Sequence, residues 1–380
     1  MIKKSFIILF SAAIIYLVVP TAVVLYNFQY SPDIWEAKRH GKRIIGFYSV
    51  QNGGGEYVIY KRTLEACKKM GIAYLGAAFN ERYSTSPLLK WPIILASEIL
   101  YYIFKPSFNL VLTHLGELLP KGYNVLYINL PTTYLMSDPY TFYPQFKHVT
   151  LFNAYADIRS ISMGENPEFL TALRLVRNDE PPFIPLYIAM NDVKLILNDK
   201  LNVALITGTL WGGWRSSNKF KRVLASLAED GLLEAYGASE YFGFLKKKYH
   251  GPFNEETPET ELLDIGRKYA ISLIAHTAEH ISEEIPTSRI SEGICSGAIV
   301  ISDMQPFIMR YFGDSVLYFD QTKSEASIYS QIREHILWVR NNPALAHEKI
   351  QKSYDIWQKN FTIEKQLQNL IHKLDHIIKN

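Results

Sequence analysis

The 380-residue sequence contains only two cysteines, no low-complexity tract and no excess of one charge. Cys67 and Cys295 lie far apart, so they exclude a disulfide framework and a cysteine-based zinc site, and they are typical of a reducing compartment. With 40 basic and 37 acidic residues, the formal net charge is +3. The chain therefore lacks the excess of Lys and Arg with which proteins bind nucleic-acid phosphates, and we expect no nucleic-acid partner.

The composition also excludes disorder as the dominant state. Hydrophobic residues make up 48% of the chain and aromatic residues 13%, so there is ample apolar surface to bury. Single hydrophobic cores stop growing at about 250 to 300 residues. A chain of 380 residues therefore predicts two ordinary domains.

The N-terminus carries one long uncharged run, residues 5–28. As a helix this run would be about 36 Å long, enough to cross a bilayer core of about 30 Å. Lys3 and Lys4 precede it, as in a cleaved signal peptide. The run is long for a signal peptide, however, and has no obvious small-x-small cleavage site. We therefore expect residues 1–30 to form an uncleaved, single-pass membrane anchor.

A basic tether is expected at residues 31–43, where Lys and Arg outnumber acidic residues. This excess favours a cytoplasmic location for the large domain, as in a single-pass protein of a bacterial inner membrane. Residues 91–104 form a second apolar run, which is short and interrupted by Glu98. Two interpretations stay open for it: a buried or groove-lining helix, which we favour, and a helix lying in a membrane interface.

The rest of the chain alternates strand and helix patterns. In the first half we expect strands at 43–48, 72–78, 124–128, 149–152 and 184–189, with a helix at 56–70. In the second half we expect strands at 203–207, 232–236, 270–275, 298–302 and 316–319, with helices at 218–229, 258–269 and 288–296. Such alternation predicts parallel sheets with helices on both faces. The fold class is therefore α/β, with two Rossmann-like doubly wound domains at 44–192 and 193–350 and C-terminal helices at 351–380.

The loop at 208–217 (GTLWGGWRSS) follows a strand and precedes a helix. Ligands of open parallel sheets bind beyond the carboxyl ends of the strands. Glycines there allow close backbone approach, the helix N-terminus favours an anion, and the Arg215 guanidinium suits phosphate oxygens. Lys219 could face the same anion. A glycine-rich turn with a solvated Arg and Lys is an equally good interpretation, because the spacing matches no phosphate-loop motif.

The segment 276–297 is the second candidate, and its Glu284 and Glu292 are separated by seven residues. With Ser288 or Thr287 as the helix cap, a carboxylate at Glu292 could accept hydrogen bonds from paired sugar hydroxyls. Such glutamate pairs also occur by chance. Arg289 could bind phosphate or pair with Glu292 across one helical turn, and the two alternatives are equally good. His276 and His280 have metal-ligand spacing but no nearby third ligand, so a metal site is the less favoured interpretation.

The third candidate is the loop at 51–56 (QNGGGE), whose Gly53 and Gly54 could admit an acceptor or a phosphate by close backbone approach. The alternative is a tight strand-helix turn in which Glu56 stabilises the helix N-terminus.

Together these motifs resemble those of GT-B glycosyltransferases, specifically the "group 1" family of retaining enzymes. That family carries a strand ending in Gly, an Arg–Lys pair, and a Glu-seven-Glu motif before a Cys/Ala-x-Gly turn. The similar residues here are Gly208, Arg215 with Lys219, Glu284 with Glu292, and Cys295-Ser296-Gly297. Residues 312–320 are similar to the strand that closes the family's sugar-nucleotide domain, and residues 53–56 to the Gly-Gly-x-Glu loop of its acceptor domain. The sequence departs from the family at Ile285-Pro286-Thr287, where a glycine-rich turn is usual, so the neighbouring Glu283 could replace Glu284.

The resemblance implies two domains that face each other across a cleft, with the helices at 351–380 packing back across it. Arg215 and Lys219 would bind the donor diphosphate, Glu292 the ribose hydroxyls, and Glu284 the transferred sugar near the reacting carbon. The implied catalytic residues are Glu284, Glu292, Arg215 and Lys219. The implied donor-binding residues are Gly208, Thr209, Arg215, Lys219, Tyr236, Gly237, Ser288, Arg289 and Glu292. On the acceptor side they are Gly53, Gly54 and Glu56.

No Asp-x-Asp motif, the metal-binding signature of the other common glycosyltransferase fold, occurs in the chain. Basic side chains and a helix end would then stabilise the leaving group, so we expect no metal and no cofactor. We expect a retaining glycosyltransferase that moves a sugar from a nucleotide-sugar donor to a membrane-associated glycan or glycolipid, such as a lipid-linked glycan or lipopolysaccharide. The alternatives are a non-catalytic sugar-nucleotide-binding scaffold, or another GT-B enzyme such as a nucleotide-sugar epimerase or a phosphorylase.

Overall fold

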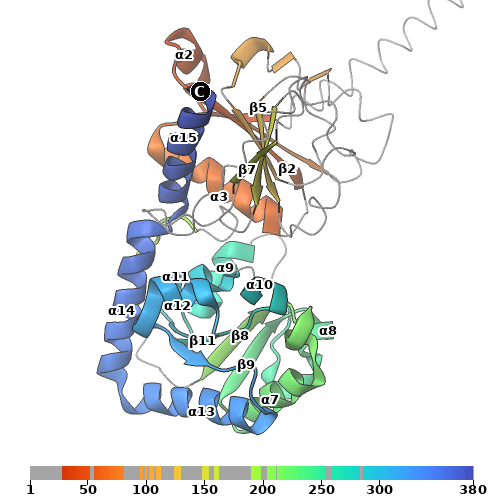
Figure 1. Ribbon diagram of the computed structural model, residues 1–380, viewed down its shortest axis with the longest axis vertical. Helices are drawn as coiled ribbons and strands as arrows, with labels where there is room; N and C mark the ends of the chain where they lie inside the picture. The colour runs from red at the N-terminus through yellow and green to blue at the C-terminus, as the bar shows by residue number, and fades with distance from the viewer. Residues whose placement is uncertain are drawn as a thin grey trace, which may run out of the picture. The chain divides into compact units, whose positions relative to one another are not determined.

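The computed structural model divides into two compact units (Figure 1). Unit 1 comprises residues 1–179 and 185–187, and unit 2 comprises residues 180–184 and 188–380. The structure describes residues 28–51, 55–80, 95–96, 99–100, 102–106, 108–112, 124–129, 148–153, 158–161, 190–197, 203–210, 212–252, 258–282 and 286–379.

Unit 1 contains a seven-stranded sheet with the order β1-β3-β2-β4-β5-β6-β7. The strands are β1 (Phe28–Tyr30), β2 (Ile44–Gln51), β3 (Ala73–Asn80), β4 (Phe108–Leu112), β5 (Asn124–Asn129), β6 (His148–Asn153) and β7 (Ile158–Ile161). The five strands from β3 to β6 are parallel, and the edge strands β1 and β7 are antiparallel to their neighbours. Helix α3 (Gly55–Met70) connects β2 to β3. It packs closely on β3, because a Cβ atom at Gly76 would lie 2.9 Å from the Tyr60 hydroxyl oxygen.

Most of the strands expected in the first half are present, with three additions. These are β4, which lies at the centre of the sheet, and the antiparallel edge strands β1 and β7. The strand expected at 184–189 lies outside the described residues.

The structure differs from the sequence interpretation between residues 28 and 43. Residues 28–30, assigned above to the anchor, form β1 and pair with Leu75–Ala77 of β3. The basic tether contains helix α2 (Ile34–Arg39), whose Ile34 and Ala37 are buried in unit 1. The remainder of the anchor, residues 1–27, lies outside the described residues, and none of the helices described elsewhere in the chain is long and apolar enough to cross a bilayer.

Unit 2 contains a five-stranded sheet with the order β12-β11-β10-β8-β9, and all its strand pairs are parallel. The strands are β8 (Ala204–Gly208), β9 (Leu233–Gly237), β10 (Ile271–Ile274), β11 (Ile299–Asp303) and β12 (Leu317–Phe319). The prediction of parallel α/β sheets is therefore confirmed in both units. The chain leaves β8 for β9 on one side and later returns to β10 on the other, so the sheet has its topological switch point between β8 and β10.

Helices cover both faces of this sheet. The helices described in unit 2 are α7 (Asn218–Glu229), α8 (Ser239–Phe242), α9 (Pro258–Gly266), α10 (Ala278–Ser282), α11 (Arg289–Cys295), α12 (Pro306–Phe312), α13 (Glu325–Asn341), α14 (Pro343–Asn360) and α15 (Ile363–Lys379), of which α15 packs on α14 and not on the described strands. Figure 1 shows α7 and α13 together on one face, with α9, α11 and α12 on the other. The C-terminal helices begin at Pro343, earlier than the expected residue 351.

Helix α7 shows why these segments are helical. Ser217 caps its N-terminus, since the Ser217 hydroxyl accepts a hydrogen bond from the Phe220 backbone N–H at 3.2 Å. Phe220, Val223, Leu224 and Leu227 recur at helical spacing and are all buried in the core of unit 2. Burial of each such side chain stabilises the fold by about 1.5–3 kcal/mol.

Candidate functional site

The loops beyond β8, β10 and β11 meet at the switch point of the unit 2 sheet. The loop after β8 begins at Gly208, whose φ of +96° favours glycine, and continues into the short 3-10 helix η4 (Gly213–Ser216). Gly212 lies against Thr277, which follows β10, because a Cβ atom at Gly212 would lie 3.0 Å from the Thr277 methyl carbon. The loops of two neighbouring strands are thus in direct contact at the edge where such sheets bind ligands.

Arg215 is held at this edge by η4. Its side chain is buried, and its Nη1 donates a hydrogen bond to the carbonyl oxygen of Ala275, just after β10, at 3.2 Å. The guanidinium carries its charge whatever the local pH. A permanent positive charge therefore lies between the ends of β8 and β10.

Helix α11 contributes a charged pair. Arg289 Nη1 donates a hydrogen bond to Glu292 Oε2, so of the two alternatives for Arg289 the structure shows the pairing across a helical turn. The Arg289 side chain also covers Gly208, where a Cβ atom would lie 2.8 Å from the Arg289 Nε. Glu292 is almost completely buried, whereas Arg289 keeps partial access to solvent. Gly208 and Arg289, 81 positions apart in the chain, are thereby brought together.

His276 and Asp303 form a buried hydrogen-bonded pair beneath these loops. The Asp303 carboxylate accepts hydrogen bonds from the His276 backbone N–H at 2.7 Å and from the His276 Nδ1 at 2.6 Å. The Thr287 backbone N–H donates to His276 Nε2 at 3.2 Å, so Nε2 is an acceptor and the imidazole is neutral, with its proton on Nδ1. Both ring nitrogens are engaged, and the His276–His280 metal pair considered above has no support. Among the described residues no group of three His, Cys, Asp or Glu could hold a metal ion.

Lys219 takes a different direction from the one expected. Its Nζ donates hydrogen bonds to the backbone carbonyl oxygens of Gln321, at 3.4 Å, and of Lys323. Both acceptors belong to the loop after β12. The ammonium group therefore holds this loop to the start of α7.

Tyr236 and Gly237 lie at the end of β9, beside a polar cluster centred on Glu234. The Glu234 carboxylate accepts hydrogen bonds from the Tyr269 hydroxyl at 2.7 Å and from Lys248 Nζ at 3.3 Å, and its Oε2 lies 2.8 Å from His250 Nε2. Burial alone would raise the pKa of Glu234, but the hydrogen bonds from Tyr269, His250 and Lys248 outweigh it and hold that pKa below its usual value. Tyr236 stacks on the His250 ring, with 5.0 Å between ring centroids. The cluster fixes the segment after β9 against the sheet.

Several predicted site residues are not placed by the structure. Glu284, its alternative Glu283, and the acceptor-side Gly53 and Gly54 lie outside the described residues. Glu56 belongs to α3, but its side chain is not described. Ser288 occupies the cap position of α11 without a side-chain cap hydrogen bond, which corrects the expectation for that residue. Thr209 is exposed immediately after Gly208.

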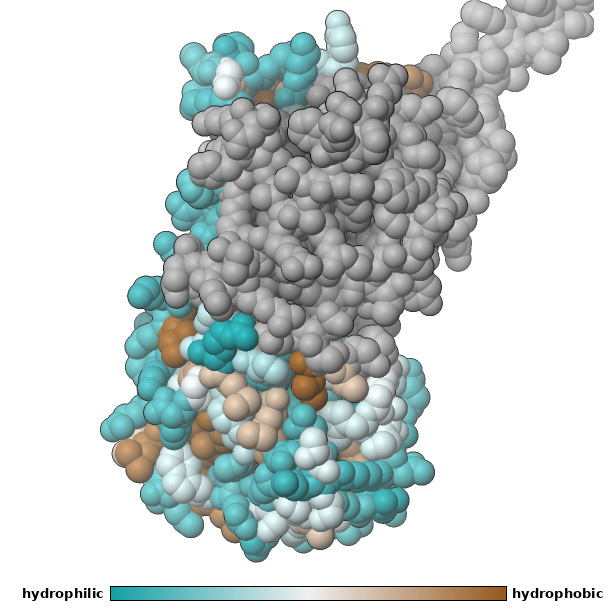
Figure 2. Space-filling view, in the orientation of Figure 1, coloured by the Kyte–Doolittle hydropathy of each residue, from teal (hydrophilic) through white to brown (hydrophobic). Residues whose placement is uncertain are grey.

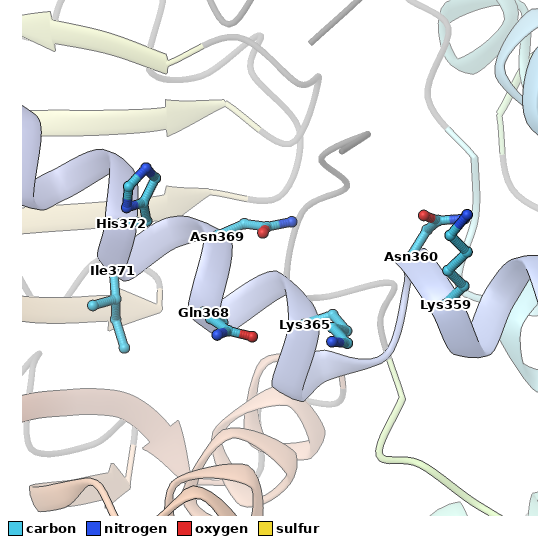
Figure 3. Close-up of a pocket in the computed structure, with 7 residues that line it drawn as sticks. All are labelled: Lys359, Asn360, Lys365, Gln368, Asn369, Ile371 and His372. Atoms are coloured by element: carbon cyan, nitrogen blue, oxygen red, sulfur yellow. The ribbon is translucent and has the colours of Figure 1, made fainter. Parts of the chain in front are cut away.

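A recess at the junction of α14 and α15 is separate from this site. Figure 3 shows Lys359 and Asn360 at the end of α14 and the other lining residues along α15. None of the predicted donor-binding or catalytic residues lines it. We therefore assign the candidate site to the switch point of the sheet.

The chain is similar to known proteins in structure but not detectably in sequence. No protein-family model matches the sequence, and no curated protein matches it. A glycosyltransferase from Rickettsia africae aligns over 89% of this chain and 99% of its own, at 12% identity and a TM-score of 0.52. A sucrose-phosphate synthase from Thermosynechococcus elongatus aligns over 88% of this chain and 100% of its own, at 11% identity and a TM-score of 0.55. A trehalose-6-phosphate synthase aligns over 88% and 99%, at 10% identity and a TM-score of 0.50.

At identities of 10–12%, the TM-scores of 0.50–0.55 show a shared fold and nothing about the reaction, which must be argued from the site itself. The two parallel α/β sheets of this chain, and its alignment over nearly the full length of these structures, agree with the architecture implied by the resemblance in residues 203–320. The chain therefore has a GT-B-like α/β fold.

Proposed function

We propose that this protein is a glycosyltransferase that takes a sugar from a nucleotide-sugar donor bound at the switch point of unit 2. The observation that carries the proposal is the convergence of Gly208, Arg215, Arg289 and Glu292 on one sheet edge. The Arg215 guanidinium, at the sheet edge where β8 ends in a glycine, suits a diphosphate. A nearly buried carboxylate suits a pair of ribose hydroxyls.

In this proposal Arg215 stabilises the negative charge that develops on the departing nucleotide. Removing one such preorganised donor typically lowers kcat by about 10²–10³-fold. The Glu292 carboxylate accepts hydrogen bonds from the ribose hydroxyls, while Arg289 holds that carboxylate in place. Lys219 acts indirectly, by positioning the loop after β12. Metal-independent transfer and a direct role for Glu284 remain parts of the proposal.

The finer parts of the proposal concern the acceptor and the stereochemistry. The uncharged run at 5–28 in the sequence motivates a membrane-associated glycan or glycolipid acceptor, on the cytoplasmic side of the membrane. Retention at the anomeric carbon is motivated by the resemblance alone. Proton NMR of the first-formed product decides the configuration, because α and β anomeric protons of most hexoses differ in their coupling constants.

The proposal is tested by binding of a panel of nucleotide sugars to the full-length protein and its Glu292→Ala variant. Loss of a charge-assisted hydrogen bond corresponds to about 10–150-fold weaker binding of the preferred donor. Glu325→Ala is the matched control, because Glu325 also pairs with an arginine, Arg222, at 2.7 Å on the exposed surface of unit 2. Saturable binding that both variants retain equally would contradict the assignment of Glu292. Binding without transfer to any acceptor would favour the scaffold alternative.

A further inference from the structure

Exposed apolar side chains gather on one part of unit 1. Large hydrophobic side chains exposed there are Tyr30 (55% exposed), Trp35 (53%), Leu95 (44%), Ile99 (40%) and Tyr102 (78%). Two short segments supply all five, and the segments touch, because the Trp35 and Phe104 ring centroids are 4.8 Å apart. We call these five side chains the apolar surface. Clustered exposed apolar side chains mark an interaction site, whereas single ones need no explanation.

The spacing of these residues shows an unpartnered helix face. Leu95, Ile99 and Tyr102 follow one another at intervals of four and three residues, the spacing of one face of a helix. Ala96 and Phe104 in the same stretch are buried, and helical spacing puts Phe104 on the side opposite the exposed residues. The stretch thus packs onto unit 1 through one face and presents a second apolar face outward.

One basic side chain contacts the apolar surface, and others lie near it in the sequence. Lys38 Nζ lies 5.6 Å from the centroid of the Trp35 ring, and Arg39, Lys42 and Lys105 are exposed nearby in the sequence. Figure 2 shows hydrophilic and hydrophobic side chains next to one another at the end of unit 1 where α2 lies. Aromatic rings with adjoining Lys and Arg match the interface of a bilayer, where rings lie at headgroup depth and cations meet anionic lipids.

The position of this surface along the chain also favours a bilayer as its binding partner. Tyr30 follows the uncharged run at 5–28 by two residues. An apolar run of that length is suited to hydrocarbon, and any bilayer that it meets lies next to β1 and α2. A protein partner would require no such neighbouring run.

We propose that the apolar surface of unit 1 lies on a bilayer containing anionic lipids, with Trp35 and Tyr102 at headgroup depth and Lys38 and Lys105 against the lipid phosphates. The surface is independent of the proposed sugar transfer, so either proposal can fail without the other. It would hold unit 1 at the membrane in addition to any contact made by residues 5–28.

The test places a polarity-sensitive fluorophore at position 102 of the full-length protein. Both native cysteines are buried, so Tyr102→Cys supplies one reactive thiol at an exposed position. The matched control is Leu345→Cys, since Leu345 of α14 is also exposed and apolar. We expect phosphatidylglycerol-containing vesicles to shift the emission of the label at 102 to the blue, with no shift at 345 and a smaller shift with phosphatidylcholine alone.

A charge variant tests the basic contribution. Each basic side chain near an anionic surface corresponds to about a fivefold change in binding, so Lys38→Glu with Arg39→Glu should raise the lipid concentration at half-maximal shift by at least about 25-fold. Lys247→Glu with Lys268→Glu, on exposed positions of unit 2, should leave it unchanged. Vesicle binding without any emission change at 102 would overturn the proposal, since the run at 5–28 alone would then contact lipid. Equal emission shifts of the labels at 102 and 345 on adding vesicles would overturn the proposal too. So would an emission shift of the label at 102 that appears only when a second protein is added, and not with vesicles.

Discussion

At the scale of single residues, the imidazole of His276 links the sheet to the candidate site. Its Nδ1 binds Asp303 at the end of β11, and its Nε2 accepts the Thr287 N–H, two residues before Arg289. The ring therefore fixes the start of α11 relative to the ends of β10 and β11. His276 is a positioning residue for Glu292 and Arg289, since it does not itself face the proposed ligand.

Replacing His276 with asparagine separates its two contacts. An asparagine amide can still donate to Asp303, but it does not reach the Thr287 N–H in place of Nε2. A buried N–H left without an acceptor costs about 1–3 kcal/mol, so we expect His276→Asn to fold and to raise KM for the donor about 5–150-fold. His276→Gln is a second substitution at the same position, to be measured beside His276→Asn. Steady-state kinetics check this, and a change confined to thermal stability, with KM unchanged, would limit His276 to a structural role.

At the scale of the elements, the ends of β8 and β9 meet too closely for any side chain. Gly237 has a φ of +147°, and a Cβ atom there would lie 2.4 Å from the Gly208 carbonyl oxygen and 2.8 Å from the Phe242 ring. Backbone cannot move aside as a flexible side chain can. Gly237 is therefore required for the pairing of the two strands at the edge that carries the site.

Gly237→Ala should accordingly destabilise unit 2 by more than about 2 kcal/mol, because it combines backbone strain with overpacking. Gly231→Ala is the matched control, since Gly231 also has a positive φ (+70°) but has no atom within 4 Å of the added Cβ. That variant should lose only about 1–2 kcal/mol. Chemical denaturation measures both, and equal losses would show that the close contact with Gly208 is unimportant.

The Glu234 cluster gives the segment after β9 a pH-dependent attachment. The lowered pKa of Glu234 means that its stabilising effect is complete above the usual glutamate value and is lost as the pH falls through the lowered pKa. Glu234→Gln should therefore reduce the free energy of unfolding at pH 7 by about 1–3 kcal/mol. The wild-type and variant stabilities should converge in acid, below the ordinary value of 4.5. Thermal melts across pH check this, with the exposed Glu240→Gln as control. A difference that is constant with pH would contradict it.

Periodicity and position along the strands were sufficient to predict most elements and the places of some candidate site residues. The buried strands flanking the 208–217 loop predicted where Arg215 would lie, and helical spacing offered the Arg289–Glu292 pair as one alternative. Strand β4 could not be recognised because Phe108–Leu112 closely follows the apolar run at 91–104, from which only three residues separate it. The His276–Asp303 pair and the contact of Arg289 with Gly208 join segments that are distant in the sequence, and the order of the strands in the sheet brings these segments together. No local pattern could therefore have predicted them.

At the scale of the whole molecule, the two sheets belong to separate compact units, each with its own buried core. The predicted donor residues that the structure describes all belong to unit 2. A ligand that binds one folded unit stabilises that unit by mass action, by about 2.7 kcal/mol at a concentration 100 times its Kd. The proposed donor should therefore act on the two cores unequally.

Hydrogen exchange of the full-length protein with and without the preferred nucleotide sugar tests this inequality. We expect slower exchange in β8, in η4 and in residues 286–292, because these segments carry Gly208, Arg215 and Glu292. Strands β2 and β3 should exchange at unchanged rates, since they belong to the core of unit 1. The Glu292→Ala variant, at the same nucleotide-sugar concentration, should lose the protection in unit 2. Protection that is equal in both units, or confined to unit 1, would place the donor elsewhere and would remove the basis for assigning sugar transfer to the switch point of the unit 2 sheet.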